Sequence, residues 1–181
     1  MSITRAEAPI VLEATRDDAW QAVVALEQSS GQRLYGYALR LGVDSSRAGD
    51  LVQETLLRLW RELSGGAAIR SPEAWTYRTL SRLAMDEHRL HRRITRLITR
   101  LGERATPQVT ETDATERVAV WSQVDRLPDR QRQVIYLRYQ ADLSFEEIGQ
   151  VMDISPGAAR SHATTALRTL RTRLDVAGGN E

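Results

Sequence analysis

Residues 143–174 carry the pattern that most restricts how this chain can fold. Ser144 precedes a short amphipathic run and Glu147 follows three residues later, which is the spacing of a capping box at the start of a helix. Residues 153–155 are typical of a turn, and Pro156 then suits the first position of a second helix. A short helix, a tight turn and a longer second helix predict a helix-turn-helix.

The rest of the chain repeats its apolar residues at helical rather than strand spacing. Helices are predicted at 17–28, 32–41, 46–63, 72–93 with a continuation to about 101, 114–126, 129–140, 145–152 and 156–174. Residues 102–113 are polar and contain Pro107, which is typical of a linker. The predicted fold class is all-α, with two small helical domains at residues 13–101 and 114–175 joined by the linker 102–113.

The second helix of the motif has two contrasting faces. An apolar stripe is predicted to pack inward, and it consists of Ala159, Ala163, Ala166, Leu167, Leu170 and Leu174. On the other face, small residues allow close approach to the major groove of DNA, and arginine, serine and threonine reach base edges or phosphates. The candidate DNA-binding residues are Ser155, Gly157, Arg160, Ser161, Thr164, Thr165, Arg168 and Arg171. An ordinary helical hairpin with an exposed polar face is the alternative.

Arginine is concentrated in the middle of the chain. All 25 basic residues are arginine, and residues 70–104 hold nine of them against four acids. On a continuous helix from Pro72, seven arginines fall within an arc of about 100°. They are Arg78, Arg82, Arg89, Arg92, Arg93, Arg96 and Arg100. A solvated helix face normally mixes both signs of charge, so this one-sided stripe favours contact with a nucleic acid.

The predicted helix 46–63 presents a second kind of surface. Its buried seam is formed by Val52, Leu56, Leu59 and Leu63. A different face combines two acids, an amide, a leucine and an arginine, which suits a protein interface: Asp50, Gln53, Glu54, Leu57 and Arg61. A merely solvated face is the alternative for these charges.

Several classes of function are disfavoured. The chain has no cysteine, which excludes disulfides, thiolate metal sites and cysteine nucleophiles. It shows no Ser/His/Asp order, glycine-rich phosphate loop or metal motif, so we expect neither an enzyme nor a cofactor or metal. His88 and His91 lack a third ligand and are expected to be exposed polar side chains. The four tryptophans are most simply core anchors, although Trp75 could instead approach a melted DNA strand.

The N-terminal residues contain no long apolar core, and no segment reaches the roughly 18 apolar residues of a membrane helix. The chain is therefore expected to be cytoplasmic, with no membrane insertion.

Four blocks occur in the order seen in extracytoplasmic-function (ECF) sigma factors of bacterial RNA polymerase. They are RAGDLVQETLLRLWREL, SPEAWTYRTLSRLAMDEHRLHRR, LPDRQRQVIYLRYQADLSFEEIGQVM and DISPGAARSHATTALRTLRTRL. The chain resembles this family over residues 13–174. The family often has an Arg-Asn pair where Ser81-Arg82 stand here, and basic residues where His162 and Thr165 stand. These departures bear on the promoter sequence rather than on the fold.

The resemblance implies a subunit that binds core RNA polymerase and promoter DNA. It implies that the helix Asp50–Trp60 docks on the clamp of the largest polymerase subunit, with the flap of the second-largest subunit as a further contact. It also implies that the helix-turn-helix reads the −35 element, while the loop Ser64–Arg70 and the helix Pro72–Arg93 handle the −10 element. The −10 candidates are Ser64, Arg70, Arg78, Arg82, Arg89, Arg92 and Arg93. An anti-sigma factor is a further expected partner.

The sequence is also compatible with two other functions. A stand-alone activator or repressor would bind duplex DNA specifically without polymerase. A protein-interaction adaptor with a structural helix-turn-helix would show no salt-dependent DNA binding.

Overall fold

The chain begins with one long helix where the sequence predicts two. The computed structural model describes residues 16–100 and 118–178, and the side chains of residues 16–89 and 121–174. Within it, α1 runs unbroken from Arg16 to Arg40. The predicted break near residues 29–31 is wrong, because the hydroxyls of Ser29 and Ser30 form hydrogen bonds that are compatible with a continuous helix. Ser29 Oγ donates to the carbonyl of Leu26, and Ser30 Oγ donates to Glu73 of another helix at 2.7 Å.

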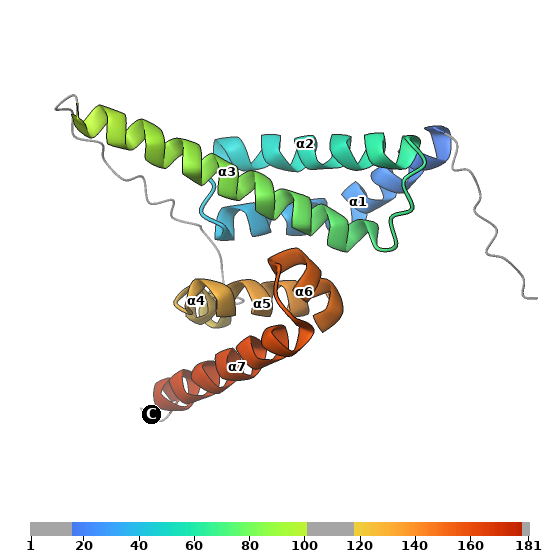
Figure 1. The fold of residues 1–181 in the computed structure, drawn as a ribbon. Coiled ribbons are helices and arrows are strands. Elements are labelled where there is room, and N and C mark those ends of the chain that lie inside the picture. The colour runs from blue at the N-terminus through green and yellow to red at the C-terminus, as the bar shows by residue number, and fades with distance from the viewer. Residues whose placement is uncertain (1–15, 101–117, 179–181) are drawn as a thin grey trace, which may run out of the picture.

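Helices α1, α2 (Ser45–Ser64) and α3 (Pro72–Arg100) form an N-terminal lobe in which α1 and α2 lie side by side and α3 crosses them (Figure 1). The Asp44 carboxylate caps α2 by accepting from the Arg47 N–H at 2.9 Å. Helix α2 ends where Gly66 turns the chain with a φ of +80°, a conformation that glycine adopts without strain. Ser71 Oγ then caps α3 by accepting from the Ala74 N–H.

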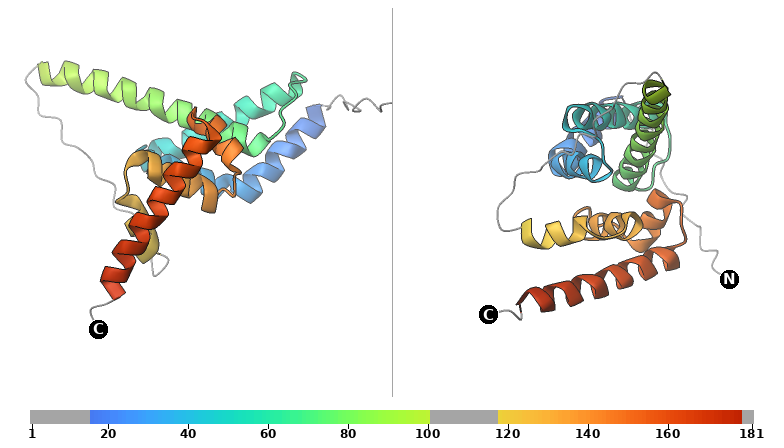
Figure 2. Two further views of the ribbon diagram at one scale, coloured as in Figure 1. Left: turned by 60° about the horizontal axis from the view of Figure 1, so that its bottom comes forward. Right: turned by 90° about the vertical axis from the view of Figure 1, so that its left-hand side faces the viewer.

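Helices α4 (Val118–Asp125), α5 (Asp129–Tyr139), α6 (Phe145–Met152) and α7 (Pro156–Gly178) form a C-terminal lobe (Figures 1 and 2). Helices α6 and α7 are the predicted helix-turn-helix, with the Ser144–Glu147 capping box in place. The turn between them is tight, because a Cβ on Gly149 would stand 2.8 Å from the carbonyl oxygen of Ile154. Ser155 Oγ caps α7 by accepting from the Ala158 N–H.

The predicted apolar stripe of α7 is only partly correct. Ala159, Ala163, Ala166 and Leu170 are buried, but Leu167 and Leu174 are 44% and 40% exposed. The buried set follows the helical repeat more closely, and the two leucines lie at the edge of the stripe, where none of the described helices fully covers them.

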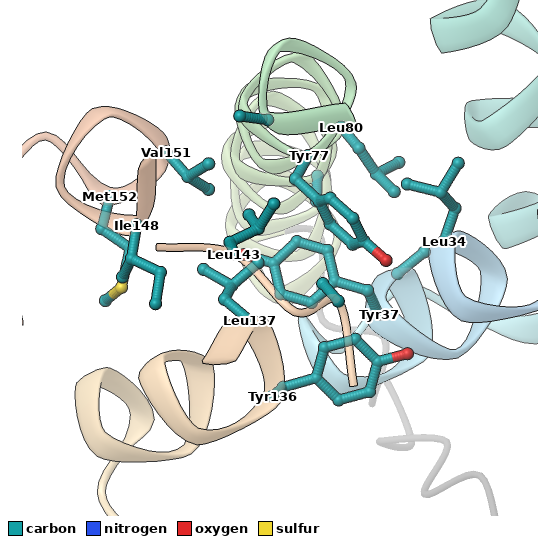
Figure 3. Packing of buried hydrophobic residues seen from close by; sticks show 14 of the residues in the cluster. Leu34, Tyr37, Tyr77, Leu80, Tyr136, Leu137, Leu143, Ile148, Val151 and Met152 are labelled. Atoms are coloured by element: carbon teal, nitrogen blue, oxygen red, sulfur yellow. The ribbon is translucent and has the colours of Figure 1, made fainter. Parts of the chain in front are cut away.

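The two lobes share one hydrophobic core. Tyr37, Tyr77 and Leu80 of the N-terminal lobe lie in the same buried cluster as Tyr136 and Leu143 of the C-terminal lobe (Figure 3). The Tyr37 and Tyr136 rings stack with centroids 5.4 Å apart. Burial raises the pKa of each of these two tyrosines to about 12, so both stay neutral at physiological pH. All regular structure in the described residues is helical, which confirms the predicted all-α class; the predicted linker 102–113 lies outside them.

Candidate polymerase and nucleic-acid interfaces

The predicted protein-binding face of α2 is open to solvent. Asp50, Gln53 and Arg61 are exposed, Glu54 is half-buried and Leu57 is 48% exposed. Helix α2 lies on the side of the N-terminal lobe remote from the C-terminal lobe (Figures 1 and 2). The opposite side of the helix is anchored by buried Val52, Leu56 and Leu59, while Leu63 is half-buried.

The acids of this face are already paired along the helix. Arg47 contacts Asp50 at 3.3 Å, and Arg58 contacts Glu54 at 2.7 Å. Such exposed pairs contribute little to stability, typically below about 1 kcal/mol each. A positively charged partner surface can therefore replace these arginines at low cost. We call Asp50, Gln53, Glu54, Leu57 and Arg61 the α2 face.

The loop between α2 and α3 forms one wall of a cleft of about 640 Å³. Ile69, Arg70, Trp75 and Arg78 line it from the N-terminal lobe. Arg70 is exposed and Arg78 is half-buried. Ser64 is less available than the sequence prediction requires, because its Oγ is enclosed and has no hydrogen-bond partner among the described atoms. We call this space the loop cleft.

The other wall of the loop cleft comes from α6, which sequence reasoning did not anticipate. Ser144, Glu146, Glu147 and Gln150 line that wall. Burial disfavours the charged Glu147 carboxylate, but hydrogen bonds from Ser71 and Ser144 outweigh this effect and hold its pKa below the usual range. Ser71, at the start of α3, therefore favours the charged form of Glu147 from across the two lobes.

The structure describes the side chains of the arginine stripe of α3 as far as Arg89. Arg82 and Arg89 are exposed, and Arg78 and Arg82 line a second cleft of about 440 Å³ together with residues of α5 and α6. Arg89 contacts Asp86 at 3.3 Å. Helix α3 continues to Arg100 as the prediction requires, but the side chains of Arg92, Arg93, Arg96 and Arg100 lie outside the described ones.

The outer face of α7 presents most of the predicted DNA-binding residues together. Those exposed are Ser155, Gly157, Arg160, Ser161, Thr164, Arg168 and Arg171, while Thr165 is half-buried. The Arg160 guanidinium lies over the Phe145 ring, 5.2 Å from its centroid. This stacking gives the guanidinium a fixed support at the start of the helix. Thr164 Oγ1 instead donates to the carbonyl of Arg160, along its own helix.

Two predictions are wrong, one about a histidine and one about a tryptophan. His88 is half-buried, with Nε2 against the carbonyl oxygen of Leu41, rather than exposed. Trp20 is 52% exposed and is not a core anchor, whereas Trp60, Trp75 and Trp121 pack against the core. His91 lies outside the described side chains. Within the described residues, no three potential ligands gather into a metal site, and no helix combines the length and apolar content needed to cross a membrane.

Both lobes match known sequence families. Residues 27–94 match the family described as Sigma-70 region 2, and residues 124–172 match Sigma-70, region 4. The chain is 31% identical over 160 residues to ECF RNA polymerase sigma factor SigL of Mycobacterium tuberculosis, covering 85% of this chain and 89% of that protein. It is 30% identical over 151 residues to ECF RNA polymerase sigma factor SigK of Mycobacterium ulcerans, covering 80% and 81%.

Two solved structures share the fold. The sigma factor RpoE of Bartonella quintana, in complex with the anti-sigma factor NepR, superposes with a TM-score of 0.63 at 20% identity and covers 88% of this chain and 98% of that one. The structure of CnrH in complex with the cytosolic domain of CnrY gives a TM-score of 0.56 at 25% identity, with coverage of 90% and 98%.

Proposed function

Because this chain belongs to the ECF RNA polymerase sigma factors, we propose that each of three surfaces carries out one binding function of a sigma factor. The protein binds core RNA polymerase and directs promoter-specific transcription initiation. In the proposed division, the α2 face docks on the clamp of the largest polymerase subunit. The loop cleft and the arginines of α3 act at the −10 element, and the outer face of α7 reads the −35 element.

The observation that carries this proposal is the combination of both sigma regions in one chain. A stand-alone repressor needs the helix-turn-helix but has no use for an exposed acidic and apolar face on α2. An adaptor has no use for the arginines that line two clefts between the lobes. We assign residues 13–101 to polymerase docking and the −10 element, 102–113 to a linker and 114–175 to the −35 element and the flap.

The proposed setting follows from the same assignment. Because promoter DNA and polymerase are found in the bacterial cytoplasm, the proposed location of the protein is the cytoplasm. There it is proposed to act by binding rather than by catalysis. An anti-sigma factor is a proposed partner, because both structural neighbours described above are complexes, one with the anti-sigma factor NepR and one with the cytosolic domain of CnrY.

The direct test is run-off transcription with core polymerase of the source organism across promoter fragments from its genome. Transcripts that start at defined positions only when the protein is added support the proposal. Sequence-specific duplex binding without any added transcription would instead identify a stand-alone regulator. Absence of salt-dependent DNA binding in both free and polymerase-bound protein would identify an adaptor.

Substitutions of two arginines of α7 should distinguish base-specific contacts to the −35 element from contacts to its phosphates. Arg160 stands in the first turns of the helix, supported by Phe145, and is placed to make a bidentate base contact. Arg160→Ala should cost about 1–3 kcal/mol on the best −35 sequence and relax the preference at one position. Arg168 and Arg171 lie two to three turns further on and are assigned to phosphates, so Arg168→Ala should weaken all promoters about equally.

The measurement is transcription from a panel of −35 variants with the wild type, Arg160→Ala and Arg168→Ala. A uniform loss for Arg160→Ala together with a sequence-selective loss for Arg168→Ala would mean that the two roles are reversed.

A further inference from the structure

Thr164 lies on the outer face of α7 with its hydroxyl already bonded. Its Oγ1 donates to the carbonyl oxygen of Arg160 at 3.0 Å, one turn earlier in the same helix. A threonine that bonds in this way turns its hydroxyl back along the helix. The residue is nevertheless exposed, so the part of the side chain that is left to contact a partner is the Cγ2 methyl.

The residues around Thr164 leave room for a close approach to this methyl. Ser161, on the same outer face, is small and exposed. The long side chain of Arg160 is directed toward α6, where its guanidinium lies 5.2 Å from the centroid of the Phe145 ring. The adjacent Ala163 is buried and anchors this turn of the helix. The Thr164 methyl and the Arg160 guanidinium are therefore two separate contact groups on one helix face.

An outward methyl can distinguish between bases in the major groove of DNA. Thymine is the one standard base that carries a methyl group there, and a threonine methyl makes an apolar contact with it. The Thr164 hydroxyl has a single proton, which is bonded to the carbonyl of Arg160, so it cannot also donate to an acceptor on a base edge. The chemistry of this side chain therefore favours recognition of a methyl group over recognition of a base acceptor.

The helical rise limits where such a thymine can lie. Thr164 is four residues beyond Arg160, which corresponds to about 6 Å along the helix axis. Successive nucleotides along one strand of B-DNA are about 3.4 Å apart. When α7 lies in the groove, the two side chains therefore reach bases that are separated by no more than about two base pairs.

We propose that Thr164 is a specificity-determining residue whose Cγ2 methyl contacts the C5 methyl of a thymine in the −35 element, within about two base pairs of the base that Arg160 contacts. Arg160 makes a hydrogen-bonded contact and Thr164 an apolar one, so the two positions differ in the base changes that they tolerate. This inference rests on the proposed role of the outer face of α7 at the −35 element.

Replacing thymine by deoxyuridine tests the proposal, because it removes the methyl and leaves every hydrogen-bonding group of the base in place. Holoenzyme assembled from the full chain and core polymerase is titrated with fragments of a promoter identified by run-off transcription. In each fragment one thymine of the −35 element, on either strand, is replaced by deoxyuridine. The measured quantity is the affinity of each fragment relative to the unmodified promoter.

Two substitutions of Thr164 separate its methyl from its hydroxyl. Thr164→Ser keeps the hydroxyl and removes the methyl, whereas Thr164→Val keeps the methyl and removes the hydroxyl. Thr172→Ser is the matched control. Thr172 is also exposed, and its Oγ1 donates to the carbonyl of Arg168 at 3.1 Å in the same manner, but it lies two turns further along α7.

The wild type should bind about fourfold more weakly when deoxyuridine replaces one particular thymine, which is the change expected for burial of one methyl-sized group. Thr164→Ser should bind that fragment and the unmodified promoter equally. Thr164→Val and Thr172→Ser should keep the wild-type preference for thymine. The sensitive thymine should lie within about two base pairs of the position at which Arg160→Ala relaxes the base preference.

The proposal is overturned if no thymine methyl of the −35 element affects binding of the wild type, or if Thr164→Ser retains the preference for thymine. Loss of that preference in Thr164→Val would also overturn it, because the hydroxyl would then be the contact group. None of these results affects the proposed function as long as the holoenzyme selects the promoter. A holoenzyme that binds the promoter and a fragment with a scrambled −35 element equally would instead contradict the proposed function.

Discussion

Reversing the charge of Asp50 and Glu54 to arginine should weaken binding to core polymerase by at least about a hundredfold, because like charges facing the same partner surface cost several kcal/mol. The fold should survive, since both acids make only exposed pairs along α2 and such pairs contribute little to stability. The measurement is a fluorescence titration of labelled protein with core polymerase, accompanied by circular dichroism to confirm unchanged helicity.

A matched control reverses the same amount of charge elsewhere. Asp17→Arg with Glu27→Arg changes two exposed acids of α1 that lie off the α2 face. This control should bind core polymerase with nearly the wild-type affinity. If the Asp50/Glu54 variant binds as well as the control, the α2 face is a solvated surface and polymerase docks elsewhere.

Replacing Arg78, Arg82 and Arg89 together by alanine should have the second-largest effect. Each phosphate contact that is lost should lower the slope of log affinity against log salt by about one unit, so the triple substitution should remove up to about three units from holoenzyme–promoter binding. Strand opening, followed by permanganate reactivity of the −10 thymines, should fall with it. The measurement is promoter affinity across a series of salt concentrations.

Exposed arginines away from α3 provide the comparison for this prediction. Arg16→Ala with Arg126→Ala removes two positive charges at exposed positions outside all three proposed interfaces. Its slope should stay close to that of the wild type. An unchanged slope and unchanged opening in the triple variant would show that the arginines of α3 are only solvated.

The helix-turn-helix was predictable because its signals are local. The capping box of Ser144 and Glu147, the turn at 153–155 and the Ser155-Pro156 start each act within a few residues, and each appears in the structure. The same local reasoning placed a break near Ser29 and Ser30, where it failed. There the Ser30 hydroxyl is satisfied by Glu73, a residue 43 positions away, and no pattern within α1 reports such a contact.

The candidate surfaces were also predictable only where a feature depends on a single helix. Helical spacing was enough to group the α2 face and the outer face of α7, because residues on one helix keep their relative positions wherever the helix packs. Spacing could not show that Arg160 rests on Phe145, that the Ser64 hydroxyl is enclosed, or that Glu146 and Glu147 stand across from Arg78. Each of these facts depends on how one helix meets another.

The tyrosine stack between the lobes has a consequence for the supply of the protein in the cell. Separation of the lobes would break the stack of Tyr37 on Tyr136 and expose both rings to water, and partly opened proteins with exposed apolar surface aggregate and are degraded. Packing of the two lobes keeps these rings covered. The Tyr37–Tyr136 stack therefore protects unused protein from aggregation and degradation to the extent that it keeps the two lobes packed together.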